Sequence, residues 1–164
     1  MWFKKFFLLE VTTPTQIVTR LPLPPLLIEL IESGRWQKPS NKKLQSVIPF
    51  LKEPVDFVKF WSPDNTWVFD PYINLANDPK TSNLFQEYLG SRGDERDLPW
   101  LDAEKSIMIA VNREHGADLG IALDYRTDFN DPRVVASDWW TEEHQCNWRL
   151  VEERFSIFVE KLQL

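Results

Sequence analysis

The residues that could bind a transition metal are two histidines and one cysteine. His144 and Cys146 lie two positions apart, and His115 lies in a separate glycine-containing segment. A zinc ion needs three or four nitrogen or sulfur ligands at characteristic spacings, and no further thiol or imidazole stands near this pair. We therefore expect no zinc site. A single cysteine also excludes an intramolecular disulfide.

A second group of candidate ligands is acidic. Four oxygen-bearing side chains that could bind calcium occur in one short run: Asp124, Asp128, Asn130 and Asp131. An EF-hand loop needs glycine at its sixth position and glutamate at its twelfth, and the loops counted from Asp124 and from Asp128 both lack them. A carboxylate pair for hydrolysis could be drawn from Asp118, Asp124 and Asp138, but nothing in the sequence fixes their separation. The sequence predicts no metal, no cofactor and no enzymatic activity.

These carboxylates belong to a stretch with the pattern of three strands. Apolar residues alternate along Ile107–Val111, Leu119–Tyr125 and Arg133–Trp139, and the connecting segments are rich in turn formers. We expect an antiparallel meander with one face in the core and the other presented outward. On the middle strand, the outward residues would be Asp118, Gly120, Ala122, Asp124 and Arg126.

Charge is concentrated in the same stretch. Residues 102–143 hold ten acidic and four basic side chains, a net charge of −6, which equals that of the whole protein. An acidic surface disfavours nucleic acid, which needs the opposite sign, and favours a basic protein partner. The alternative is a solvated face that only aids solubility.

The sequence therefore predicts a surface for a protein partner. Its residues share the outward face or its rim: Asp118, Asp124, Arg126, Asp138, Trp139 and Trp140. Adjacent side chains in a strand point to opposite faces, so one of the two tryptophans could fill the core while the other stands on the acidic face. In the alternative arrangement both cover the edge of the core.

Helix signals flank the meander. A helix should begin at Pro24 or Pro25 and end at Gly34, and a second, capped by Ser40 or Asn41, should end near Pro49. Three further elements are predicted between these helices and the meander: strands at Val55–Trp61 and Trp67–Phe69, and a helix from Asp78 to Gly90.

A terminal helix is predicted from Asn147, which would be its N-cap. Its apolar residues fall on one side at helical spacing: Trp148, Val151, Phe155, Phe158, Val159 and Leu162. Leu150 lies opposite this stripe and would contact another element or leave a small exposed apolar patch.

The length of 164 residues, with 43% hydrophobic and 27% charged residues, is typical of one globular domain, 1–164. The apolar run Phe6–Leu9 near the N-terminus is ended by Glu10 and is shorter than a signal-peptide core. No stretch is long enough to cross a membrane. We expect a cytoplasmic protein that is a monomer or a weak dimer.

The run LPWLDAEKSIMIAVNREHGADLGIALDYRTDFNDPRVVASDWW, followed by Trp148 and VEERFSIFVEKL, resembles the SUKH superfamily. The similarity is strongest over residues 98–164. It rests on Leu21-Pro22 before the first helix, on the acidic strand Ala122–Tyr125, and on Trp148 with Phe155 and Phe158. That family includes yeast cell-wall synthesis regulators of the Smi/Knr type and many bacterial proteins.

The resemblance implies an α+β fold, a mostly antiparallel sheet flanked by short N-terminal helices and a C-terminal helix, and no enzymatic activity. It also implies a bacterial immunity protein that binds and neutralises a toxin domain, often a nuclease. The alternative is a housekeeping regulatory or scaffold protein of the same fold, as the yeast relatives suggest.

Overall fold

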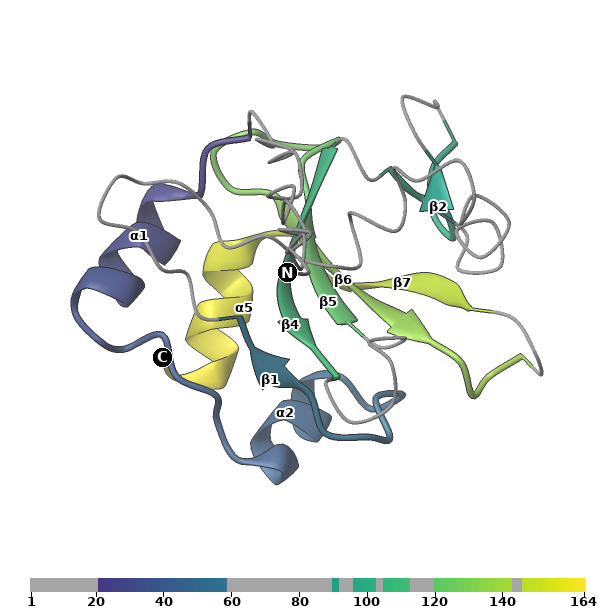
Figure 1. The fold of residues 1–164 in the computed structure, drawn as a ribbon, viewed down its shortest axis with the longest axis horizontal. Coiled ribbons are helices and arrows are strands. Elements are labelled where there is room, and N and C mark those ends of the chain that lie inside the picture. Colours follow the sequence, from purple (N-terminus) through teal and green to yellow (C-terminus); the bar gives the residue numbers. More distant parts are fainter. Residues whose placement is uncertain (1–20, 59–89, 92–95, 103–104, 113–119, 143–145) are drawn as a thin grey trace, which may run out of the picture.

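A mostly antiparallel sheet with helices beside it organises the chain (Figure 1). The computed structural model describes residues 21–58, 90–91, 96–102, 105–112, 120–142 and 146–164. The helices within these residues are α1 (Pro25–Glu32), α2 (Asn41–Val47) and α5 (Phe155–Leu162). The predicted α+β fold is confirmed. None of the described helices has the length and apolar sequence needed to span a membrane.

The sheet has the strand order β1-β4-β5-β6-β7, and all neighbours are antiparallel. Its strands are β1 (Asp56–Phe57), β4 (Ser106–Val111), β5 (Gly120–Asp124), β6 (Arg133–Asp138) and β7 (Asn147–Glu152). The predicted meander corresponds to β4, β5 and β6 and is confirmed. A separate pair joins β2 (Gly90–Ser91) to β3 (Leu101–Asp102) in parallel.

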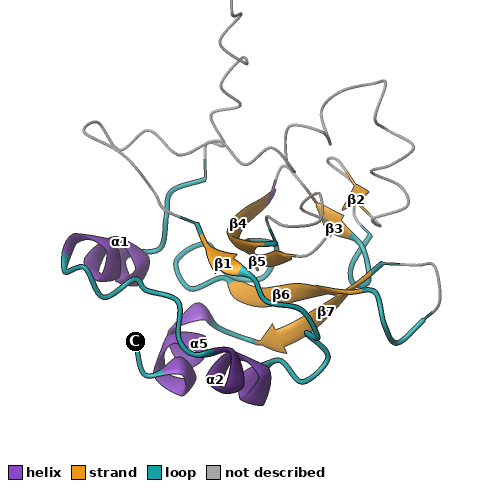
Figure 2. Cartoon of the chain, turned by 60° about the horizontal axis from the view of Figure 1, so that its bottom comes forward, coloured by secondary structure: helices purple, strands orange, loops and turns teal. Residues whose placement is uncertain are grey.

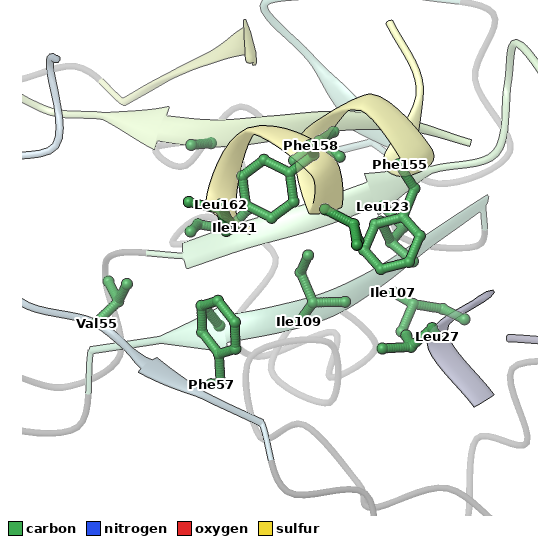
Figure 3. Packing of buried hydrophobic residues seen from close by; sticks show 14 of the residues in the cluster. Leu27, Val55, Phe57, Ile107, Ile109, Ile121, Leu123, Phe155, Phe158 and Leu162 are labelled. Carbon is green, nitrogen blue, oxygen red and sulfur yellow. The ribbon is translucent and has the colours of Figure 1, made fainter. Parts of the chain in front are cut away.

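One face of the sheet is covered by the helices (Figure 2). Alternate residues of the strands, such as Ile121 and Leu123, pack there against Phe155 and Phe158 of α5 (Figure 3). All four side chains are fully buried. Tyr125 continues this face, and its hydroxyl donates a hydrogen bond to the carbonyl of Pro22 at 2.8 Å. The sequence alternation therefore identified this half of the core correctly.

The opposite face of the sheet is also buried, which the sequence prediction did not anticipate. Met108, Ala122, Val135 and Trp148 form a second apolar cluster there together with Leu101. Leu98 and Trp100 pack against this cluster. The expectation of an outward-facing side is wrong for the described strands, because the segment before β4 folds back over it.

The first two helices follow their sequence signals closely. Pro25 occupies the first position of α1, and Gly34 lies just past its end with a φ of 71°, a conformation that glycine adopts without steric cost. The hydroxyl of Ser40 accepts the N–H of Lys43 and caps α2. Local capping chemistry was sufficient to place both helices.

The predicted terminal helix is wrong over its first half. Asn147–Glu152 form strand β7, and the helix begins only at Phe155. Asn147 is not an N-cap, because it pairs with Asp138 of β6. The spacing of Trp148 and Val151 suits a helix, but in strand β7 it places the two side chains on opposite faces, Trp148 in the second cluster and Val151 on the helical face.

Several predictions fall outside the described residues. Of the strand predicted over Val55–Trp61, the structure shows β1 at Asp56–Phe57 and does not describe residues 59–61. The strand at Trp67–Phe69 and the helix from Asp78, apart from Gly90 in β2, also lie outside them. The same holds for Asp118, His115 and His144.

We predict that Trp148→Ala destabilises the protein by about 3–5 kcal/mol, because the indole is buried to 1% exposure in the second cluster. Urea unfolding of the purified variant measures the change. Leu150→Ala on the same strand is the control, since that side chain is 40% exposed and its loss should have a small effect. Near-wild-type stability of Trp148→Ala would contradict the packing of the second face.

Candidate interaction surface

The small residues of β5 do not leave an open surface. A Cβ atom added to Gly120 would lie 1.9 Å from Cε of Met108 and 3.1 Å from the carbonyl oxygen of Ala110. Ala122 is fully buried in the same cluster. The flat area that the sequence offered to another chain is therefore filled by the protein's own methionine.

Asp124 is buried between two arginines instead of standing on an outward face. Its side chain is 0% exposed. Oδ2 accepts Nη2 of Arg126 at 2.7 Å and Nε of Arg133 at 2.9 Å. The side chains of Arg126 and Arg133 are themselves only 11% and 8% exposed. The predicted contact of Asp124 with a partner required an exposed side chain, and that premise is wrong. A buried carboxylate needs hydrogen-bonding partners such as these arginines within the chain.

The same arginines hold the segment that covers the second face. Arg126 donates to the carbonyl of Trp100 at 2.7 Å and to the carbonyl of Arg96. Arg133 donates a hydrogen bond to the carboxylate of Asp97. This bond lowers the pKa of Asp97 below its ordinary value, and the hydrogen bond from the N–H of Leu98 lowers it further. We call Asp97, Asp124, Arg126 and Arg133 the arginine latch. The guanidinium of Arg126, predicted to contact a partner, therefore bonds residues of the chain itself.

Asp138 closes the turn after β6. It is fully buried. Its Oδ1 accepts the N–H groups of Trp140 at 2.9 Å and Thr141 at 3.2 Å, and its Oδ2 accepts Nε of Arg149. Burial raises the pKa of Asp138, but the hydrogen bonds from Thr141, Trp140 and Arg149 outweigh it and hold the pKa below its ordinary value. Asp138 therefore holds the turn through Trp140 and Thr141 and bonds β7 through Arg149.

The predicted acidic face is also divided by the register of the sheet. Asp124 alternates with Ala122 and belongs to the face of the second cluster, whereas Asp138 alternates with Ala136 of the first. Arg133 and Asp138 begin and end β6, so the two carboxylates lie at opposite ends of the sheet as well. They cannot form one surface.

The tandem tryptophans divide between core and solvent. Trp139 is half-buried against the first cluster, and Trp140 is 39% exposed. Both follow the end of β6 at Asp138, in the bend that this carboxylate holds. Of the six predicted partner-binding residues, Trp140 is the one whose side chain the structure leaves open to a partner among those it describes.

The carboxylates considered as calcium ligands have structural roles. Asp128 accepts the N–H groups of Asn130 and Asp131 in the β5–β6 turn. Asp131 accepts both the N–H and the hydroxyl of Ser156, at 2.9 and 2.6 Å, and so caps α5 from outside the helix. Within the described part of the chain, no three His, Cys, Asp or Glu residues gather to hold a metal ion.

A groove lies beside β7 that the sequence did not reveal. Its volume is about 480 Å³. The residues that line it come from β7 and from segments beside it: Phe50, Leu98, Pro99, Glu142, Asn147, Trp148, Arg149 and Leu150. Leu150 is exposed, as its position opposite the apolar stripe allowed. The groove itself could not be foreseen, because Phe50 and Leu98 reach it only through the tertiary fold.

No protein-family model, curated protein or solved structure matches this chain.

We predict that Asp124→Asn destabilises the protein by about 1–3 kcal/mol, because it removes the buried charge that Arg126 and Arg133 share and leaves the largely exposed Asp97 as the carboxylate beside them. The matched control is Asp128→Asn, the same change at an exposed position. Chemical unfolding of the two variants distinguishes them. Equal stability of both would contradict the latch.

We predict that Asp138→Asn reduces stability most at neutral pH. Because the folded state lowers the pKa of Asp138, the carboxylate stabilises the fold fully above its unfolded pKa of about 3.9, and this contribution disappears as pH falls through the folded pKa. The difference in unfolding free energy between wild type and variant should be constant between about pH 5 and 7 and shrink below about pH 4. A difference that persists unchanged to acidic pH would contradict this.

Proposed function

We propose that this chain is a non-enzymatic binding protein of the immunity type, which binds and neutralises a toxin domain. The resemblance over residues 98–164 supports this class of partner. Most of the residues that carry the resemblance, including Trp148, Phe155 and Phe158, lie in the core. They bear on the fold, so the place of binding must be argued from the surface.

The observation that carries the proposal is the exposure of Trp140 and Leu150 near one groove. The large apolar side chains exposed among the described residues are Phe129, Trp140 and Leu150. Leu150 lines the groove, and Trp140 precedes by two residues Glu142, which also lines it. An exposed tryptophan close in the chain to a hollow lined by both polar and apolar side chains fits the composition of an interface centre.

Charge supports a basic partner. The protein carries a net charge of −6. The carboxylates of Asp124 and Asp138 are paired with arginines inside the fold, so the exposed Glu142 must supply the attraction at the groove. Proteins that act on nucleic acids present basic surfaces, which makes a nuclease the first candidate toxin.

The proposal places the protein in the cytoplasm, without a cofactor. The single cysteine, Cys146, is buried, which is compatible with a reducing compartment. Binding of nucleic acid by the chain itself is not proposed, because its charge has the wrong sign.

The test uses the purified chain and the nuclease or other toxin domain encoded beside its gene. We expect a stable complex at equal molar ratio, loss of the toxin's activity, and an association rate that falls as salt is raised. Trp140→Ser should weaken this complex, and Phe129→Ser, at the other end of β6, is the control.

A toxin domain that stays active in the presence of excess chain would overturn the proposal. Capture of a housekeeping enzyme in place of a toxin would favour a regulatory or scaffold role.

A further inference from the structure

The groove follows the outer edge of a strand. β7 is the last strand of the sheet, as Figure 1 shows. Trp148 faces the second cluster, and Val151, at the register shift, packs on the helical face. Phe50 lines the groove from the segment after α2, and Leu98 lines it from the segment over the second cluster. Because its walls come from both faces of the sheet, the groove lies against the edge of β7.

The backbone of β7 offers hydrogen-bonding groups to this hollow. The N–H of Trp148 donates to the carbonyl of Pro99 at 3.1 Å, away from β6. Alternation along an antiparallel strand directs the N–H and C=O of Leu150 to the same outer side. The register shift near Val134 and Val135 interrupts the regular ladder just beyond. The edge available for pairing is therefore short and centred on Leu150.

One side chain at this edge is suited to receive a polypeptide. Leu150 is 40% exposed beside the apolar wall formed by Leu98 and Phe50. Asn147 also lines the groove, but it is only 5% exposed and its Nδ2 is buried, so it shapes the wall and does not bond an added segment.

The charges at the groove indicate a basic occupant. Arg149 bonds Asp138 and lies 3.6 Å from Glu142 through its Nη2. Two carboxylates face one guanidinium, which leaves one negative charge. Glu142 carries it at the surface, since its side chain is 57% exposed while that of Asp138 is fully buried.

We propose that the groove beside β7 receives an extended segment of the partner protein, which pairs with the backbone of Leu150 as an added strand. The segment places an apolar side chain between Leu150 and Leu98 and a basic side chain toward Glu142. Strand addition of this type obtains affinity from the backbone and specificity from pockets for alternate side chains. Only the identity of the partner as a toxin rests on the proposed function.

The experiment uses the full chain and a phage-displayed library of linear twelve-residue peptides as the probe. We expect selected peptides with an apolar residue near a lysine or arginine. Leu150→Pro removes the outward N–H without removing a ladder donor to β6, a replacement that edge strands tolerate. It should weaken binding by about tenfold or more, as the loss of a backbone hydrogen bond and the shape change imply.

Matched variants separate the contributions. Leu150→Val keeps the N–H and an apolar side chain and should bind within a few fold of wild type. Phe129→Ser should leave affinity unchanged. If Leu150→Pro fails to fold by circular dichroism, Glu142→Lys tests the same groove and should weaken binding.

Three outcomes would overturn the inference: no peptide is selected, the groove variants bind as well as wild type, or sedimentation shows a dimer that Leu150→Pro dissolves. The last would mean that a second copy fills the groove. Because no toxin enters this experiment, its failure is independent of toxin neutralisation.

Discussion

The fold depends on a single buried carboxylate. Asp124 accepts hydrogen bonds from Arg126 and Arg133, and through them it fixes the segment that runs from Arg96 to Trp100. That segment carries Leu98 and Trp100 onto the second face of the sheet. Without the latch, the cluster around Trp148 would lose its cover. Leu98 and Pro99 also line the groove, so the interaction surface depends on the same contact.

Local sequence signals predicted the elements that are stabilised locally. The proline at the start of α1, the serine cap of α2 and the alternation along β4, β5 and β6 each act within a few residues. Their structural consequences were therefore readable from the chain. The end of the sheet was not, because Asn147–Glu152 satisfies both a helical and a strand pattern and only pairing with β6 decides between them.

The error at the predicted acidic face has a definite physical origin. Asp124, with its small neighbours Gly120 and Ala122, was interpreted as exposed because it alternates with the core-facing residues of the same strand. Whether a carboxylate is exposed depends on cations that the fold brings to it, here Arg133 across the β5–β6 pair. A hint was present in β4, where Met108 and Ala110 are apolar like the core-facing residues with which they alternate, so that the run Ile107–Val111 is apolar throughout. Such continuous apolar runs are typical of strands buried on both faces.

The close approach of Met108 to Gly120 joins two positions that are far apart in the chain but neighbours on adjacent strands. The terminal methyl group of the methionine occupies the volume that a side chain at residue 120 would need, but it is the end of a flexible side chain and can turn aside. The carbonyl oxygen of Ala110, 3.1 Å from the same position, belongs to the backbone of β4 and cannot turn aside in this way. In evolutionary terms, position 120 is therefore limited to small residues by the backbone of the neighbouring strand, and position 108 need not change with it.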